Sequence, residues 1–281
     1  MLQKKAKEIF QWIDDTEIVG VTLTLKAICE LKLSPNYTTG LHAWFLHQVR
    51  NSDPQLSAYL HDEQSEKAFA ISPLIGNLEQ KDKKFFIVDN DIYTWTISAL
   101  SKPLCDWLKT WCNNYPSTLN LSTGRFLIEK ISITLSATTY NLLWSMPLSK
   151  LSCFTLTFLS STCFRHKQHH LPLPIPYNIF HSYLRRWNHF APEVFPQEAF
   201  LKWIEQVVYI TNYDLTCTKI AVAKQGFVTG FIGNVEFGIN RKVLQNEDFE
   251  RLLFALIQLA PYCSTGYKSA FGLGQTRLLT K

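Results

Sequence analysis

The most informative segment of the sequence lies near the C-terminus and reads Gly266-Tyr-Lys-Ser-Ala-Phe-Gly272-Leu-Gly274-Gln-Thr-Arg-Leu-Leu279. It connects a predicted helix over 246–260 with a predicted strand over 274–279. Glycine permits positive φ and a close approach of the backbone, so this loop can turn its N–H groups toward an anion. Lys268 and Arg277 add positive charge beside it. We therefore expect the loop to hold a phosphate.

A turn that only joins helix to strand is the alternative interpretation of this loop, and the basic flanking residues favour the anion site. The stretch is not a nucleotide-binding P-loop, because no Gly-Lys-Ser/Thr closes it and the strand follows the loop instead of preceding it. The predicted phosphate-binding positions are Gly266, Lys268, Gly272 and Gly274.

Outward from this loop, the same order of elements occurs twice. The second half contains a strand, a helix, two strands, a helix and a strand, at 153–159, 177–190, 207–222, 226–239, 246–260 and 274–279. The first half contains a strand at 19–25, helices at 40–50 and 54–61, short strands near 68–74, 84–89 and 92–99, a helix at 102–113 and a strand at 125–134. Two βαββαβ units predict an α+β fold of tandem ferredoxin-like domains, which we place at 1–148 and 149–281.

The net positive charge of the chain comes entirely from its second half. Residues 1–150 contain 15 Lys+Arg and 15 Asp+Glu, whereas residues 151–281 contain 13 and 8. Over the whole chain, 46% of the residues are apolar and 18% are charged, which is typical of a folded globular protein. A basic half favours an anionic partner such as nucleic acid.

No segment predicts a membrane span or export. The longest apolar stretch, Leu252 to Leu259, is far too short to cross a bilayer. Acidic residues follow the N-terminal lysines where a signal peptide needs an apolar core. The seven cysteines form no Cys-x-x-Cys pair, so we expect reduced thiols, no metal site and no cofactor. We expect a soluble intracellular protein.

Three segments together resemble one known family. The glycine spacing at 266, 272 and 274 before a final strand resembles the signature of the RAMP superfamily of CRISPR-associated RNA-binding proteins. Two further segments, Asp53-Pro-Gln-Leu-Ser-Ala-Tyr-Leu-His61-Asp with the following Lys67-Ala-Phe-Ala-Ile-Ser-Pro-Leu, and Phe164-Arg165 with the later Phe180-His-Ser-Tyr-Leu-Arg-Arg-Trp-Asn188, are similar to the CRISPR repeat endoribonucleases, the sixth Cas family. The resemblance runs from about residue 40 to the C-terminus.

This resemblance implies binding of a CRISPR repeat in precursor RNA and one cut per repeat without a metal ion, leaving a 2′,3′-cyclic phosphate. It also implies a prokaryotic cytoplasmic protein that works with subunits of CRISPR effector complexes, and it leaves a homodimer open. The first alternative is a RAMP subunit that binds repeat RNA or acts as a scaffold without cutting it. The second is a ferredoxin-like interaction protein with no RNA role.

Metal-free cleavage by the neighbouring 2′-hydroxyl needs a base, an acid and cationic support, and histidine suits both proton-transfer roles. His61 ends the predicted second helix and matches the family's Leu-His position. Bacterial relatives pair that residue with a histidine on the preceding helix, where His42 borders the apolar stripe and His47 points nearly the opposite way. Lys67 matches a lysine of the family. We therefore expect the catalytic residues among His42, His61, Lys67 and His47, without deciding which histidine is the base.

Basic residues interleaved with aromatic ones predict the RNA-binding surface of the second half. Arginine can hold a phosphate with two parallel hydrogen bonds, while aromatic rings stack on unpaired bases. The predicted contacts are Arg165, Lys167, Arg185 and Arg186. Three histidines at 166, 169 and 170 resemble a metal cluster, but we interpret the adjoining Leu171-Pro-Leu-Pro run as a mobile loop. We therefore expect these histidines to contact solvent or RNA.

Overall fold

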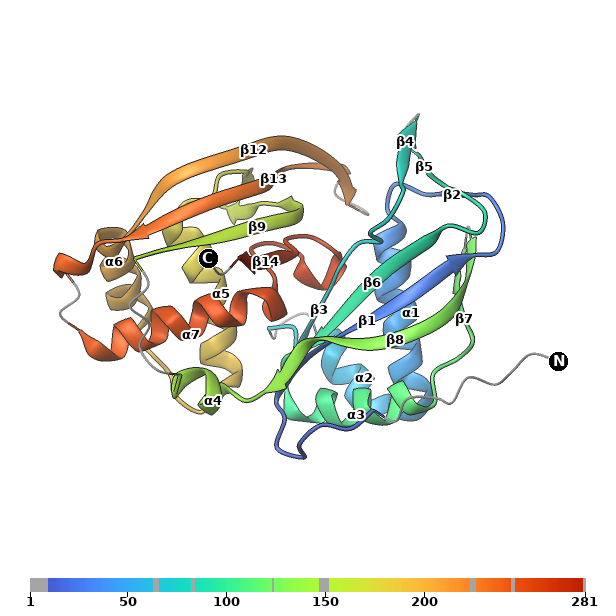
Figure 1. Cartoon of the computed structure of the whole chain (residues 1–281), viewed down its shortest axis with the longest axis horizontal. Coiled ribbons are helices and arrows are strands. Elements are labelled where there is room, and N and C mark those ends of the chain that lie inside the picture. The colour runs from blue at the N-terminus through green and yellow to red at the C-terminus, as the bar shows by residue number, and fades with distance from the viewer. Residues whose placement is uncertain are drawn as a thin grey trace.

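Figure 1 shows the computed structural model of the chain, in which two lobes, each with a main antiparallel sheet, lie side by side. The structure describes residues 10–62, 66–81, 84–122, 124–146, 152–222, 226–243 and 246–279. The expected domain boundary at 148–149 falls outside these residues.

The N-terminal lobe has a five-stranded sheet in the order β3-β6-β1-β8-β7. Its elements are β1 (Ile18–Ala27), α1 (Tyr37–Ser52), α2 (Pro54–His61), β3 (Phe69–Ile71), β6 (Ile92–Ala99), α3 (Lys102–Asn113), β7 (Thr118–Leu121) and β8 (Gly124–Thr138). A separate three-stranded sheet consists of β2 (Leu31–Leu33), β5 (Lys84–Ile87) and β4 (Glu79–Lys81). The helices cover one face of the main sheet.

Local sequence explains these elements. Alternating residues of β1, among them Val21, Leu23 and Leu25, are fully buried, as expected of a strand with one face on the core. Between α1 and α2, the Asp53 carboxylate accepts a hydrogen bond from the Leu56 N–H at 2.8 Å and so caps α2. A proline at the first helical position, Pro54, fits because its missing N–H is not needed there.

The C-terminal lobe has a four-stranded sheet in the order β12-β13-β9-β14. Its elements are β9 (Cys153–Thr162), the hairpin β10 (Phe164–His166) and β11 (His169–Leu171), α5 (Pro176–Phe190), α6 (Gln197–Val207), β12 (Val208–Val222), β13 (Gly226–Ile239), the 3₁₀ turn η2 (Arg241–Val243), α7 (Glu247–Cys263), the 3₁₀ turn η3 (Ser269–Phe271) and β14 (Thr276–Leu279). A short helix, α4 (Tyr140–Trp144), precedes this lobe.

The two strand orders confirm the tandem ferredoxin-like prediction. In each lobe the first strand lies between the third and the fourth strand of the βαββαβ unit, and all pairs are antiparallel. Two local predictions were incomplete. The strand near 84–89 belongs to the separate small sheet, and α4 and α6 were not foreseen. The three histidines lie in the β10–β11 hairpin, directly before the Pro-Leu-Pro segment.

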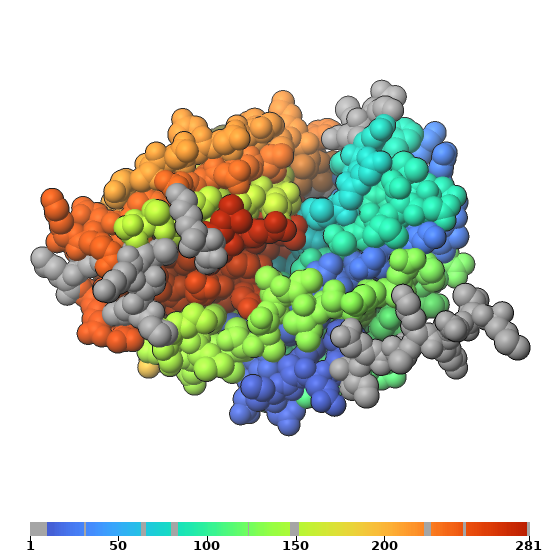
Figure 2. Space-filling model, viewed as in Figure 1, coloured from blue at the N-terminus to red at the C-terminus, as the bar shows by residue number. Residues whose placement is uncertain are grey.

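The lobes contact each other through side chains and through η3. The Tyr262 hydroxyl of α7 donates a hydrogen bond to the Ser136 carbonyl of β8 at 2.8 Å. The Tyr140 hydroxyl of α4, which precedes the C-terminal lobe, donates to the Leu100 carbonyl at 2.9 Å. The turn η3 packs on α1 and β3 of the N-terminal lobe. In Figure 2 the red C-terminal segment lies at the seam, beside blue and green parts of the other lobe. None of the described helices is long and apolar enough to span a bilayer.

Candidate active site

His42 on α1 lies under the glycine-rich loop of the other lobe. Its ring is stacked on Phe271, with centroids 4.0 Å apart, and also faces Phe69 at 5.6 Å. Its Nδ1 lies 2.8 Å from the Ala270 carbonyl oxygen. Because a carbonyl oxygen only accepts, Nδ1 carries the hydrogen, and in neutral His42 the lone pair is on Nε2.

Burial keeps the His42 imidazole neutral. Only 8% of the residue is exposed, and this desolvation lowers the pKa of His42 to about 4. The bond to the Ala270 carbonyl raises the pKa, and the positive charges of Lys67 and His61 lower it further. The pKa of His42 on α1 therefore responds to His61 at the end of α2 and to Lys67 in the segment after it.

His61 is the last residue of α2 and is exposed. It lines a pocket of about 630 Å³ together with Arg50, Pro54, Ser57, Ala58 and Asp62. The Lys67 ammonium group donates to the Leu60 carbonyl at 3.2 Å and to the Asp62 carbonyl. Lys67 is therefore held at the C-terminal end of α2, beside His61.

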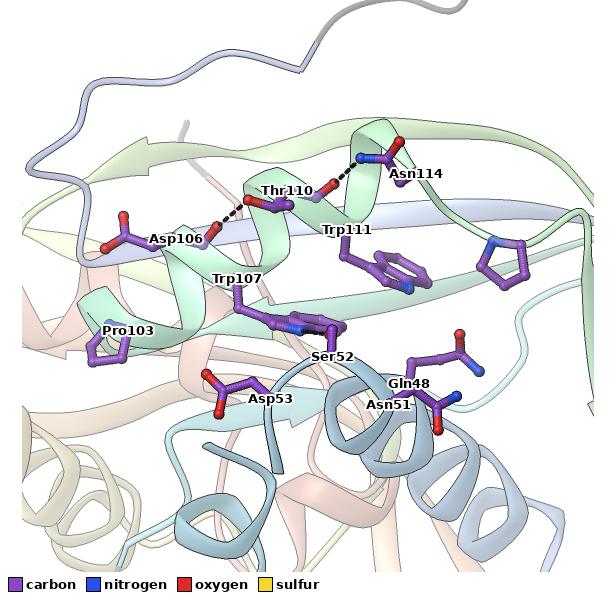
Figure 3. Close-up of a pocket in the computed structure, with 11 residues that line it drawn as sticks. Gln48, Asn51, Ser52, Asp53, Pro103, Asp106, Trp107, Thr110, Trp111 and Asn114 are labelled. Carbon is purple, nitrogen blue, oxygen red and sulfur yellow. Dashed lines mark hydrogen bonds between the residues drawn. The ribbon is translucent and has the colours of Figure 1, made fainter. Parts of the chain in front are cut away.

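His47 lies on a different side of α1. Its Nδ1 is 3.4 Å from the Asn51 side-chain nitrogen, and Asn51 lines the pocket of about 750 Å³ between α1 and α3 that Figure 3 shows. Trp107 and Trp111 form one wall of that pocket, and neither His42 nor His61 lines it. His47 is thus exposed beside Asn51, whereas His42 is buried under the glycine-rich loop.

The glycine-rich loop needs its glycines for close packing. Gly274 has φ of +70°, and a Cβ there would lie 1.8 Å from the Thr265 carbonyl oxygen. Gly272 has φ of +85°, and a Cβ there would lie 3.0 Å from Thr38 Cγ2 on α1. These values place both residues in the left-handed region that favours glycine. The loop is therefore shaped by contacts with its own backbone and with the N-terminal lobe.

Most amides of the loop are used inside the protein. The Thr265 N–H donates to the Gly274 carbonyl at 2.7 Å, the Tyr267 N–H to the Cys163 carbonyl at 2.9 Å, and the Gly274 N–H to the Ser161 carbonyl at 3.0 Å. Lys268, with φ of +54°, is half-buried, and burial lowers the pKa of its ammonium group. These bonded amides cannot also bind a phosphate, so the loop cannot present all of its N–H groups to RNA as predicted. Lys268 at the turn is the charged group of the loop that can still bind a phosphate.

The structure separates the two neighbouring arginines of α5. Arg185 is exposed and forms a 3.0 Å ion pair with Glu66, which lies next to Lys67 in the other lobe. Arg186 is 4% exposed and donates to the Ser269 hydroxyl of η3 at 2.5 Å. The prediction placed Arg186 on the RNA-binding surface, but a side chain buried beneath the loop offers RNA no contact area.

The hairpin β10–β11 stands next to the loop. The rings of His170 and Tyr267 are 5.1 Å apart. Arg165 and Lys167 are exposed, and Lys167, at the hairpin turn, has φ of +53°. These two cations therefore belong to a hairpin that contacts the glycine-rich loop through His170. This position suits the predicted RNA-binding surface around the loop.

A further cleft lies between the lobes. Hydroxyls of three strands line it, with Thr22 Oγ1 2.8 Å from both Thr96 Oγ1 and Thr134 Oγ1. Arg277 and Gln275 of the other lobe complete its wall, and its volume is about 440 Å³. Within the described ranges, no group of three or more His, Cys, Asp or Glu side chains is arranged to hold a metal ion.

Several residues that shape the site could not be found in the sequence. The Ala270 carbonyl and the Phe271 ring contact His42, although they lie 228 and 229 positions away in the sequence. The Ser269 hydroxyl accepts a hydrogen bond from Arg186. Every residue has a backbone carbonyl, so the sequence cannot indicate which one will bind a histidine. In the sequence, Phe271 looks like any other apolar residue. Only the glycine spacing around them marked the segment as special.

Comparisons with known proteins agree with this architecture. The model of the family "CRISPR Cas6 N-terminal domain" matches residues 20–142, and that of "CRISPR-associated endoribonuclease Cas6" matches residues 156–276. No curated protein matches the chain.

Solved structures share the fold over nearly the whole chain. A product complex of Cas6 from Thermus thermophilus is 23% identical, with a TM-score of 0.76 over 93% of this chain and 100% of that one. A substrate-mimic complex of another Cas6 is 21% identical, with a TM-score of 0.71 over 94% and 100%. A Cas6-related protein from Pyrococcus furiosus is 13% identical, with a TM-score of 0.61 over 95% and 99%. With both halves matching their own Cas6 family models in the expected order, the chain belongs to the Cas6 family of CRISPR-associated endoribonucleases.

Proposed function

We propose that this protein cuts CRISPR repeats in precursor RNA without a metal ion, by attack of a 2′-hydroxyl on the adjacent phosphate. The observation that carries the proposal is the contact between His42 and the Ala270 carbonyl. It joins a loop of the basic C-terminal lobe to a histidine of the N-terminal lobe, close to His61 and Lys67. RNA held by the loop would lie beside three groups able to move protons or balance charge.

His42 is the proposed base. Its Nδ1–H is held by the Ala270 carbonyl, so Nε2 is the nitrogen that can take the 2′-hydroxyl proton. The 2′-oxygen then attacks phosphorus, the bond to the 5′-oxygen breaks, and a 2′,3′-cyclic phosphate forms. A bound phosphate places negative charge near His42, which favours the imidazolium produced in this step. The buried ring needs a local opening or an RNA-induced shift of Phe271 to reach its substrate.

His61 is the proposed acid that protonates the leaving 5′-oxygen. It is exposed at the end of α2, in a pocket that Arg50 also lines. Lys67 is fixed beside it by two carbonyl groups, so its charge stays near the reacting phosphate. Arg165 and Lys167 of the hairpin and Lys268 of the loop supply the cationic surface for the RNA backbone.

The experiment uses 5′-labelled repeat RNA in EDTA. His42→Gln and His61→Gln each remove one proton-transfer group, so we expect single-turnover cleavage to fall about 10²- to 10⁴-fold while RNA affinity changes little. His189→Gln is the matched control, because His189 is an exposed histidine on α5 whose ring contacts Phe190. A 2′-deoxy substitution at the cleaved nucleotide should abolish the reaction.

Two results would remove this assignment. Undiminished cutting by the His42→Gln, His61→Gln double variant would exclude both histidines. Tight, salt-sensitive RNA binding with no product would favour the repeat-binding scaffold instead. We further infer that the protein acts in the prokaryotic cytoplasm beside CRISPR effector complexes, and light scattering of the RNA complex decides whether the active form is a homodimer.

A further inference from the structure

Arg186 carries a buried positive charge with no anionic partner among the described residues. It is 4% exposed, and none of the ion pairs of the described chain includes it. Its charge acts on Tyr140, Tyr183 and Cys263, but burial raises the pKa of all three, so all stay neutral. Its Nε is buried without an acceptor in the described residues. An unpaired buried cation is costly, so its presence calls for a reason.

The hydrogen bonds of Arg186 show what its side chain does. Nη1 donates to the Ser182 carbonyl at 3.1 Å, one turn back on α5, and Nη2 donates to the Ser269 hydroxyl at 2.5 Å. The planar guanidinium reaches both acceptors at once, which a lysine ammonium on a flexible stem does not do in the same geometry. The Ser182 hydroxyl also accepts a hydrogen bond from the Gly266 N–H at 3.2 Å. Helix α5 therefore holds the loop at two points, through Arg186 and through Ser182.

The same three-residue turn is held from its other side by the N-terminal lobe. Ala270 accepts from His42, Phe271 covers the His42 ring, and Gly272 abuts Thr38. Left-handed residues on either side of the turn, Lys268 and Gly272, leave it little freedom to shift. Any movement of Ser269 must therefore move the Ala270 carbonyl and the Phe271 ring, because they are its immediate neighbours in the chain.

We propose that Arg186 is a positioning residue: by holding Ser269, it keeps the Ala270 carbonyl and the Phe271 ring on His42 and so fixes the tautomer and the burial of that histidine. The catalytic consequence rests on the proposed function, whereas the effect on His42 itself does not. Arg186 acts from the C-terminal lobe on a residue of the N-terminal lobe, without touching it.

The charged groups around His42 allow the direction of the effect to be derived. Lys67 and His61 act on it from the side of α2, and Lys268 lies 5.3 Å from the Phe271 ring on the loop side. The Glu66 carboxylate is paired with Arg185. Burial is the largest cause of the low pKa of His42, larger than the opposing effect of Ala270. Loosening the turn therefore raises the pKa of His42 toward its ordinary value.

The test measures the His42 titration directly by NMR on RNA-free protein with ¹³C-labelled histidine, with the His42 signal assigned from the His42→Gln variant. Two variants remove the hydrogen bond between Arg186 and Ser269. The first is Arg186→Gln. The second, Ser269→Ala, removes only one hydroxyl and is expected to fold even if Arg186→Gln does not. Arg251→Gln is the matched control, because Arg251 forms a 2.7 Å surface ion pair with Glu247 on α7. We expect the His42 midpoint to move up in both test variants and to stay near 4 in the control.

Cleavage gives a second readout that a merely structural role would not move. The acid limb of the kcat/KM profile reports the free enzyme. If the pKa of His42 rises from about 4 to about 6.5, its neutral fraction at pH 5 falls about 30-fold. We expect kcat/KM at pH 5, relative to pH 8, to fall by up to that factor in Ser269→Ala.

An unchanged His42 midpoint in folded Arg186→Gln and Ser269→Ala proteins would overturn the proposal, as would an equal shift in Arg251→Gln. The two hypotheses remain separable. Normal cleavage by His42→Gln would remove the catalytic role of His42, while the titration would still decide whether Arg186 positions that ring.

Discussion

Gly274→Ala tests whether the loop backbone is packed as the structure describes. At φ of +70°, an alanine pays the left-handed penalty of about 1 kcal/mol. Its Cβ would lie 1.8 Å from the Thr265 carbonyl oxygen and 3.0 Å from the Thr265 nitrogen, so that peptide must shift by more than about 1 Å to reach an ordinary contact distance. The shift breaks the 2.7 Å bond from the Thr265 N–H to the Gly274 carbonyl, which is worth about 1 kcal/mol.

The chain offers a matched control at Gly226. Its φ of +78° is similar, but no described atom lies within 4 Å of its added Cβ. Gly226→Ala should therefore cost only the backbone penalty of about 1 kcal/mol, whereas Gly274→Ala should cost about 3 kcal/mol, including residual strain. Urea unfolding followed by circular dichroism measures both values against the parent protein.

RNA affinity provides the functional side of the same comparison. Because Gly274 closes the loop that carries Lys268, we expect Gly274→Ala to weaken repeat binding more than Gly226→Ala does. Equal losses of unfolding free energy in the two variants, within about 0.5 kcal/mol, would show that the loop is not closed on Thr265 and would refute the reasoning.

Three further predictions concern the rest of the molecule. Between pH 6.5 and about 4, the unfolded chain binds a proton that folded His42 does not, so stability should fall by about 3 kcal/mol as the pH drops, and His42→Gln should remove that slope in urea titrations. Glu66→Gln breaks a partly exposed ion pair with Arg185 and should change the unfolding free energy by less than about 1 kcal/mol. Maleimide labelling with mass spectrometry should modify the exposed Cys29 and Cys217 well before the buried thiols.

Local sequence patterns correctly predicted much of the fold. The alternation in β1 and the helical spacing after Gly40 placed α1 within a few residues of its observed bounds, and Asp53-Pro54 marked the start of α2. These signals work because side-chain periodicity and capping depend on neighbours in the chain. The repeated order of elements then predicted two ferredoxin-like sheets.

Other elements could not be predicted correctly because their pairing or packing partners are far away in the chain. The segment Lys84–Ile87 has the composition of a strand, but whether it joins the main sheet or a small separate one depends on pairing with Leu31–Leu33. In the C-terminal lobe, α6 lies between α5 and β12, where the pattern gave only a connection. Pairing partners are chosen by packing across the fold, which no local window contains.

The candidate site divides in the same way. Residue type and spacing are local properties, so they were enough to predict the fold class, to mark the glycine loop and to propose a short set of histidines and cations. Contacts between distant parts of the chain could be learned only from the folded protein. His42 contacts a carbonyl 228 residues away, His47 is exposed beside Asn51, and Arg186 lies beneath the loop while Arg185 stays exposed. Two adjacent arginines on one helix differ by about 100° in direction, so only the elements packed around that helix determine which is buried.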